Sequence, residues 1–124
     1  MIKKNKDVVG YLGPRGTHSE DVCSSYYHQD QWDFKTYATI DACIRGTFNG
    51  DVAECIVPIE NSLEGSVNIT LDTLAHEVNL SIIKEIVWPI RHHLLTKSPT
   101  IDIQTIVSHP QALAQCRHYL AAHY

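Results

Sequence analysis

The sequence contains little basic charge and no cluster of it. Lysine and arginine together number 10, against 14 aspartate and glutamate residues, so the net charge is −4 with neutral histidines. The longest basic run is the pair Lys3-Lys4. Because phosphate binding needs a concentrated basic face, we expect no nucleic-acid partner.

Long apolar runs are also absent. No stretch approaches the ~18 consecutive apolar residues that a membrane-spanning helix needs, so no membrane partner is expected. The chain begins with basic residues, but the short apolar run that follows is interrupted by Asp7 and Gly10, unlike a signal peptide. These features predict a cytoplasmic protein.

The cysteines are few and show no CxxC spacing. Cys23, Cys43 and Cys116 stand among apolar residues at helical spacing, and Cys55 lies in a strand-like run. This distribution favours buried, reduced thiols over a disulfide framework. With 124 residues, of which 44% are hydrophobic, the chain is long enough to bury a core.

Strand-like segments recur along the chain. Apolar runs predict short strands over residues 8–12, 33–39, 53–59 and 105–110. The segment 80–97, rich in Ile and Val, predicts a long strand-type run that Pro89 interrupts. Helical spacing separates several of these segments, and this alternation predicts an α/β fold with a largely parallel sheet.

Four segments have helical spacing. The first begins at Thr17 or Ser19, either of which could cap it, and the second runs from Thr39 to Asn49-Gly50. The third follows the polar stretch near residue 65, and the fourth begins at Pro110. The apolar faces predicted for the first and third helices are Val22, Cys23, Tyr26 and Tyr27, and Val67, Leu71, Leu74 and Val78.

Three turns share one arrangement, in which a strand leads through a polar turn to the start of a helix. They are "YLGPRGTHS" (11–19), "VPIENSLEGSV" (57–67) and "IVSHPQAL" (106–113). In a parallel sheet such turns lie at the carboxyl ends of the strands, where free N–H groups and helix dipoles favour an anion. The side-chain donors they carry are Thr17, His18, Ser19, Asn61, Ser62, Ser66, Ser108, His109 and Gln111.

Helix capping is the alternative explanation for each turn taken alone. Ser, Thr and Asn commonly cap helices, and Gly65 could serve only a positive φ angle. "GPRG" is not a P-loop, because it lacks the Gly-Lys-Ser/Thr ending. Three such turns on one sheet favour a small anionic ligand.

Three segments together carry a family resemblance. "GYLGPRGTHS", "VPIENSLEGSVNITLDTL" and "SHPQALAQC" resemble, in order, the opening signature segments of the prephenate dehydratase family. The resemblance implies a fold like type 2 periplasmic binding proteins, a mixed, largely parallel sheet with helices on both faces. It implies conversion of prephenate to phenylpyruvate, water and carbon dioxide in phenylalanine biosynthesis, without a cofactor.

The resemblance also implies where the substrate binds, in a cleft between two lobes. Residues 8–79 would form the first lobe and 80–124 the start of the second. The implied substrate-binding residues are Thr17, Ser19, Asn61, Ser62, Gly65, Ser66, Ser108, His109 and Gln111.

Two departures from the family pattern leave the catalytic residue unassigned. His18 stands where the family motif has phenylalanine; it could donate a proton, but a half-buried substitute is the favoured interpretation. The Thr-Arg-Phe motif, whose threonine is the family's candidate acid, does not occur in these 124 residues, nor does the regulatory ACT domain. The chain alone is therefore expected to be inactive.

Other functions and assemblies stay open. The chain could be a non-catalytic module that binds a small aromatic or keto-acid anion, or a self-associating fragment. We expect a homodimer, with domain swapping through residues 80–95 as one route. No metal site is expected, because neighbours such as His92 and His93 point to opposite faces of a strand. A carboxylate pair (Glu60, Glu64) and a Ser108–His109 nucleophile pair have no further support.

Overall fold

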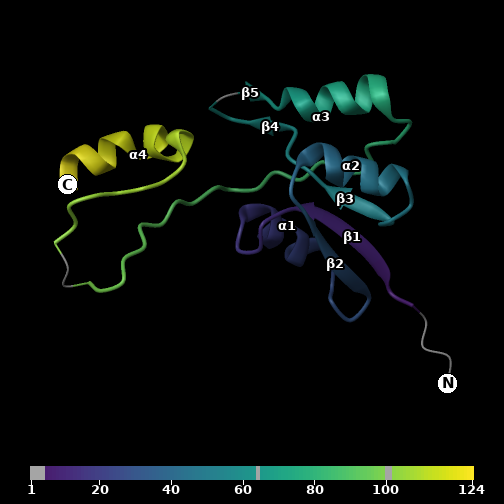
Figure 1. The fold of residues 1–124 in the computed structure, drawn as a ribbon, viewed down its shortest axis with the longest axis horizontal. Coiled ribbons are helices and arrows are strands. Elements are labelled where there is room, and N and C mark those ends of the chain that lie inside the picture. Colours follow the sequence, from purple (N-terminus) through teal and green to yellow (C-terminus); the bar gives the residue numbers. More distant parts are fainter. Residues whose placement is uncertain (1–4, 64, 100–101) are drawn as a thin grey trace. The chain divides into compact units, whose positions relative to one another are not determined.

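A sheet of three parallel strands lies at the centre of the first of two units, Met1–Trp88 and Pro89–Tyr124. The computed structural model describes residues 5–63, 65–99 and 102–124. The strands are β1 (Asp7–Leu12), β2 (Trp32–Tyr37) and β3 (Glu54–Ile56), in the order β2-β1-β3 (Figure 1). The three strands predicted for this part of the chain, and their parallel pairing, are confirmed.

The alternating side chains of β1 explain why both faces of the sheet are covered. Val9 and Tyr11 face α1 (His18–Tyr26) and form the core cluster with Cys23. The opposite face at Gly10 meets Tyr37 and Val52, on the side covered by α2 (Ile40–Phe48). One helix on each face confirms the predicted α/β architecture of this unit.

Aromatic side chains complete the core on the α1 side. Trp32 and Phe34 of β2 pack there, with Tyr27 contacting Trp32 edge-on at 4.8 Å between ring centroids. Tyr11 and Phe34 are related in the same way at 6.4 Å. The prediction that Tyr26 belongs to the buried face was wrong: it is 42% exposed, and the Lys84 ammonium lies 4.5 Å from its ring centroid.

The sequence signals at the ends of α2 are confirmed. The hydroxyl of Thr39 accepts a hydrogen bond from the Ala42 amide at 3.1 Å, which caps the first turn. The helix ends at Asn49, and Gly50 follows with a φ of +81°, a conformation that glycine adopts at little cost.

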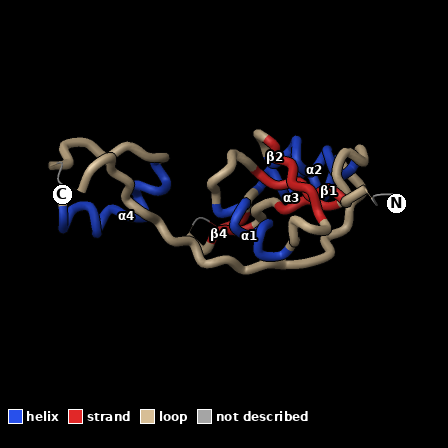
Figure 2. The backbone as a smooth tube through the Cα atoms, turned by 90° about the horizontal axis from the view of Figure 1, so that it is seen from below, coloured by secondary structure: helices blue, strands red, loops and turns tan. Residues whose placement is uncertain are grey.

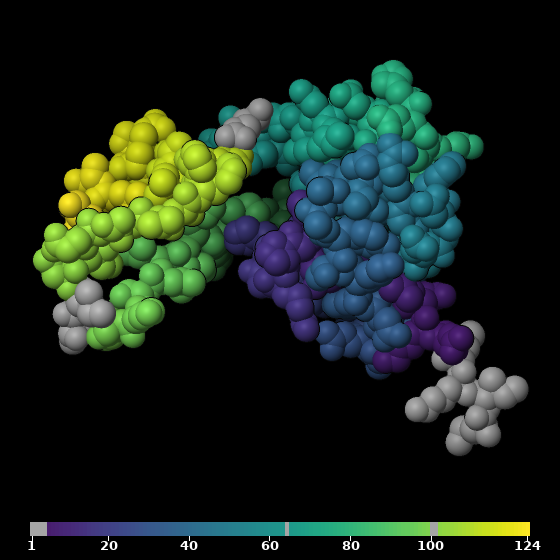
Figure 3. All heavy atoms as spheres, viewed as in Figure 1, coloured from purple at the N-terminus to yellow at the C-terminus, as the bar shows by residue number. Residues whose placement is uncertain are grey.

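A third helix packs on α2. It consists of α3 (Asn68–Asp72) and the π-helical turn η1 (Thr73–Glu77), and its atoms lie against those of α2 in Figure 3. Arg45 of α2 pairs with Asp41 at 2.9 Å and with Glu77 of η1. The salt bridge between Arg45 and Glu77 joins α2 to η1.

The buried face of this third helix differs from the prediction. Leu71 is 39% exposed, whereas Thr70 and Thr73 are fully buried. The hydroxyl of Thr70 donates to the Pro58 carbonyl at 2.6 Å, which makes its burial favourable. Of the predicted apolar face, Val67, Leu74 and Val78 are partly buried and only Leu71 is exposed.

No strand forms within the described residues of 80–97 and 105–110, so the two strands predicted there were wrong. Figure 2 draws the described residues of both segments as loop. A strand needs a neighbour to bond with, and these segments pair with none among the described residues.

The second unit contains one helix among its described residues, α4 (Pro110–His123). Pro110 occupies its first turn, as predicted, and Nδ1 of His109 accepts from the Gln111 amide at 3.2 Å. Within the described part of the chain, no helix combines the length and apolarity needed to cross a bilayer.

The packing of α2 leaves no room for a side chain at Gly46. A Cβ added at Gly46 would lie 2.5 Å from Cζ of Tyr37. Ala is normally better than Gly inside a helix, but here overpacking dominates, and we expect Gly46→Ala to lower the free energy of unfolding by about 1–3 kcal/mol. Urea denaturation measures this change in the free energy of unfolding.

The control is Gly46→Ala in a Tyr37→Ala background. With the ring removed, the same substitution should be neutral or stabilising, and the double-mutant cycle isolates the contact. Equal losses in both backgrounds would contradict the proposed clash.

Candidate functional site

The first two polar turns lie at the same edge of the sheet. The last pairs of the β1–β3 ladder join Gly10 to Cys55 and Tyr11 to Ile56. The chain leaves both strands immediately afterwards, at Leu12 and Ile56. Because the strands are parallel, the residues that follow them start from neighbouring points, as a shared ligand site requires.

The loop after β1 is fixed by backbone geometry. The Gly13-Pro14 peptide is cis, and the Gly13 amide donates to the Tyr37 carbonyl at 2.8 Å. Gly16 has a φ of +83°, and the chain then enters α1. Thr17, His18 and Ser19, the three candidates of this turn, are each half-buried at the start of that helix.

The side chains predicted to cap α1 do not do so. Thr17 occupies the N-cap position, but its hydroxyl donates to the Leu12 carbonyl at 3.4 Å, and no side-chain cap bond is formed. The Glu20 carboxylate instead accepts a hydrogen bond from the Gly16 amide. Glu20 takes the part of the glutamate in a capping box, reaching back to the amides before the helix.

Glu20 is the centre of a polar cluster that sequence reasoning missed. It accepts from the Tyr11 hydroxyl at 3.1 Å and lies 3.4 Å from Nε of Arg15. The Gly16 hydrogen bond, helped by Tyr11 and Arg15, lowers the pKa of Glu20 below 4.5 despite partial burial. Burial and the neighbouring carboxylate raise the pKa of Tyr11.

This cluster borders a small cavity of about 290 Å³. Its lining residues are Tyr11, Arg15, Glu20, Gln29, Phe34 and Thr36. The spacing Thr17-x-x-Glu20 is a capping-box signature and could have identified Glu20 from the sequence. Nothing in the local pattern could have placed Tyr11 beside it.

The second turn forms a hairpin, which was not predicted. Strands β4 (Glu60–Asn61) and β5 (Gly65–Ser66) pair antiparallel, and the Val67 amide donates to the Ile59 carbonyl at 2.8 Å. Gly65, the first residue of β5, has a φ of +79°, a conformation that glycine adopts at little cost.

The hairpin presents its candidate residues outward. Ser62, Gly65 and Ser66 are exposed and Asn61 is half-buried. Oδ1 of Asn61 accepts a hydrogen bond from the Leu63 amide at 2.9 Å, so this residue also shapes the turn. Glu64, which belongs to the unsupported carboxylate pair, lies outside the described residues.

The third turn belongs to the second unit. Ser108 and His109 are exposed and Gln111 is half-buried at the start of α4, with His109 serving as its N-cap. The strand expected before this turn does not form among the described residues.

His18 has a nearby acidic partner. Its Nδ1 lies 3.9 Å from Oδ2 of Asp21 across one helical turn, and its side chain is 41% exposed. The half-buried position agrees with its interpretation as a replacement for an aromatic side chain.

Histidines and cysteines do not assemble into a metal centre in the described part of the chain, where no group of three potential ligands occurs. Nε2 of His92 lies 2.8 Å from Oε1 of Gln115.

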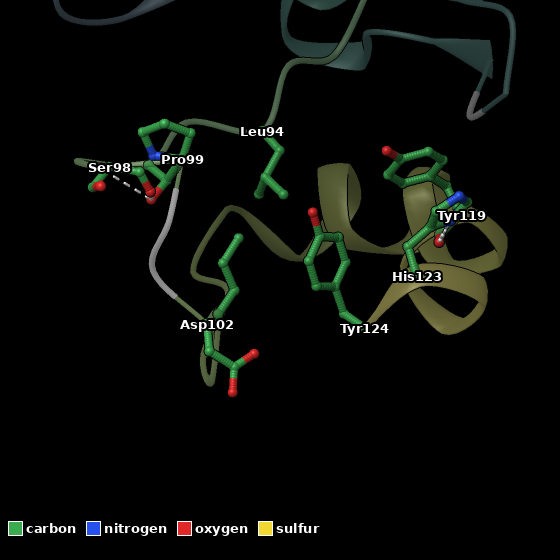
Figure 4. A pocket seen from close by; sticks show the side chains of 9 residues that line it. Leu94, Ser98, Pro99, Asp102, Tyr119, His123 and Tyr124 are labelled. Atoms are coloured by element: carbon green, nitrogen blue, oxygen red, sulfur yellow. Dashed lines mark hydrogen bonds between the residues drawn. The ribbon is translucent and has the colours of Figure 1, made fainter.

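A second cavity, of about 540 Å³, lies in the second unit (Figure 4). The rings of Tyr119 and His123 stack there, with centroids 4.2 Å apart, and Leu94, Asp102 and Tyr124 also line the cavity. It contains none of the residues selected from the sequence.

A family model described as prephenate dehydratase matches residues 9–124. The prephenate dehydratase of Bacillus subtilis is 41% identical over 120 residues, covering 94% of this chain and 42% of the relative. That of Methanocaldococcus jannaschii is 39% identical over 125 residues, with 96% and 43% coverage. The chain thus spans about two fifths of the length of these relatives.

A solved structure has a similar fold. The crystal structure of prephenate dehydratase from Streptococcus mutans superposes with a TM-score of 0.54 at 33% identity, covering 59% of this chain and 38% of that one. The fold class expected from the sequence motifs is confirmed by this likeness.

The polar cluster gives a pH-dependent prediction. Because the folded state lowers the pKa of Glu20, its ionised form stabilises the fold above the unfolded pKa, and this contribution disappears as pH falls through the folded value. Glu20→Gln should therefore be less stable than wild type near pH 7, and the two should converge as pH falls through the lowered pKa of Glu20.

Thermal unfolding between pH 3 and pH 8 measures this difference. Glu85→Gln removes an exposed carboxylate within residues 80–97 and is the matched control. Its unfolding temperature should match that of wild type at every pH. A Glu20→Gln deficit that stays constant across the range would exclude the ionised carboxylate as its cause.

Proposed function

The chain belongs to the prephenate dehydratase family, and on this premise we propose that the protein converts prephenate to phenylpyruvate, water and carbon dioxide. This reaction would serve phenylalanine biosynthesis. The observation that carries the proposal is the family match over residues 9–124, which includes both turns at the sheet edge.

The chemistry of the substrate suits the residues of these turns. Prephenate has two carboxylates and a hydroxyl on a non-aromatic ring, and loss of hydroxide with carbon dioxide makes the ring aromatic. Neutral donors and backbone amides can hold the carboxylates, and an acid must protonate the leaving hydroxyl. Redox chemistry is not involved, and we propose that no cofactor takes part.

We place the substrate carboxylates against the two turns of the first unit. Asn61, Ser62, Gly65 and Ser66 would contact one from the hairpin, and Thr17 and Ser19 would approach from the start of α1. Ser108, His109 and Gln111 would contribute from α4, a helix start whose amides also favour an anion. The catalytic acid is unassigned, with His18 a weak candidate.

The lobes would follow the sequence expectation. Residues 8–79 would form most of the first lobe, and residues 80–124 would begin the second. The free cysteines support a reducing compartment, and we propose the cytoplasm. Cys23 and Cys43 are buried as predicted, and burial raises the pKa of Cys23 to about 11; Cys55 and Cys116 are partly buried.

Asn61 provides the direct test. In the complete protein, Asn61→Ala should weaken phenylpyruvate binding by about 1–3 kcal/mol, because a donor to a buried carboxylate is lost. Titration calorimetry measures binding, and ultraviolet absorbance measures phenylpyruvate formed from prephenate. Ser24→Ala, on an exposed position of α1, is the control. Unchanged affinity and rate would remove Asn61 from the site.

The alternative function is a module that binds an aromatic or keto-acid anion without turnover. The same assays separate the two, since the module would bind phenylpyruvate but form none from prephenate. The 124-residue chain by itself should show no turnover, because catalytic groups that act as a unit lose most of their effect when one is absent.

Homodimerisation is a further part of the proposal. Large apolar side chains between residues 80 and 95 are exposed, among them Ile83 at 72% and Val87 at 87%. The outer edge of β3 has no strand partner among the described residues. Exposed apolar surface and open strand edges both promote association, and two copies could exchange this segment.

Sedimentation equilibrium of the 124-residue chain tests the dimer. We expect wild type to associate, and Val87→Lys to shift the equilibrium toward monomer because burying a charge is unfavourable. Glu85→Lys, two residues away and also exposed, is the control. A folded wild-type protein that sediments as a single species of 14.0 kDa at all concentrations would show that the prediction is wrong.

A further inference from the structure

The buried hydroxyl of Thr70 lies beneath the hairpin of the candidate site. Thr70 is 1% exposed, and its Oγ1 donates to the Pro58 carbonyl at 2.6 Å, across 12 residues of sequence. The segment that this bond closes, from Pro58 to Thr70, includes Asn61, Ser62, Gly65 and Ser66. Thr70 itself cannot touch a ligand on the exposed side of the hairpin.

Two hydrogen bonds at the base of the hairpin bear on its position. The first is the Val67 amide bonded to the Ile59 carbonyl at 2.8 Å, which closes the base of the hairpin. The second is the Thr70 side chain, which connects α3 to Pro58, two residues beyond the end of β3. The first bond lies within the hairpin, whereas the second relates the hairpin to the helix behind it.

We propose that Thr70 is a positioning residue, which fixes the direction of the β4–β5 hairpin and thereby the alignment of its donors with a bound carboxylate. This inference rests on the proposed function for its ligand. Donors aligned before binding hold an anion more tightly than donors that must be ordered by it. Loss of the hydroxyl leaves the Pro58 carbonyl without this partner and frees the hairpin to change direction.

Thr73 provides an internal comparison. It lies three residues further along the same helical segment and is 0% exposed, but its hydroxyl has no hydrogen-bond partner among the described residues. Replacing either threonine by valine exchanges a hydroxyl for a methyl group at nearly constant volume. The two substitutions therefore differ mainly in whether a hydrogen bond is lost.

The experiment compares Thr70→Val, Thr70→Ser and Thr73→Val in the complete protein. We expect Thr70→Val to weaken phenylpyruvate binding about tenfold and to raise KM for prephenate more than it lowers kcat. Hydrogen exchange at the Val67 amide should become faster. Thr70→Ser keeps the hydroxyl and should retain wild-type affinity, and Thr73→Val should match wild type in every measurement.

Several outcomes overturn the inference. One is wild-type affinity for phenylpyruvate in Thr70→Val, and another is an equal loss of affinity in Thr73→Val. A third is a tenfold loss of affinity in folded Thr70→Ser. This third outcome would still decide the question if Thr70→Val failed to fold. Failure of the proposed function is seen separately, because wild type would then bind no phenylpyruvate. In that case the positioning role can still be tested without a ligand, because an unchanged rate of hydrogen exchange at the Val67 amide in Thr70→Val would refute it.

Discussion

The structure of the first unit depends on the double pairing of β1. This strand bonds to β2 along its whole length and to β3 through its second half, so its backbone groups are satisfied within the sheet. Its side chains must then serve two faces at once. Val9 and Tyr11 supply bulk toward α1, and Gly10 leaves room for the Tyr37 ring on the side of α2. Both helices, and the turns at the sheet edge, take their places from this one strand.

The elements of the first unit were predictable because their signals are local. Val8 to Leu12 is a compact apolar run, Thr39 caps a helix, and Asn49-Gly50 ends it; each needs only near neighbours in sequence. The segment 80–97 shows the limit of such signals. Its Ile and Val residues express a preference for extended backbone, but a strand also requires a second backbone to bond with, which the described residues do not provide. The extended conformation was foreseeable, whereas the pairing depends on segments elsewhere.

The candidate site was predictable in its residue types and only partly in its geometry. The polar turns after β1 and β3 could be placed at one sheet edge from the parallel order alone. Their internal structure was less accessible, because Glu20 rather than Thr17 makes the side-chain hydrogen bond at the start of α1 and a hairpin separates β3 from α3. Only the Glu20 contact has a local signature, the capping-box spacing. The Glu20 contact joins a side chain to the backbone and the hairpin joins backbone to backbone, and hydrophobic periodicity records neither. Apolar spacing likewise predicted a buried Leu71 and gave no signal for Thr70, whose hydroxyl bonds to the distant Pro58 carbonyl.

The two turns at the sheet edge are stabilised in different ways, and this bears on how an anion would be held. The β1 turn is anchored by a carboxylate: Glu20 accepts from the Gly16 amide and the Tyr11 hydroxyl. That negative charge would repel a ligand carboxylate unless Arg15, 3.4 Å away, offsets it. The hairpin turn is anchored by neutral groups, since a hydroxyl and a carbonyl fix its base. A neutral anchor adds no charge that would repel a bound anion, although the carboxylate of Glu60 belongs to the same hairpin.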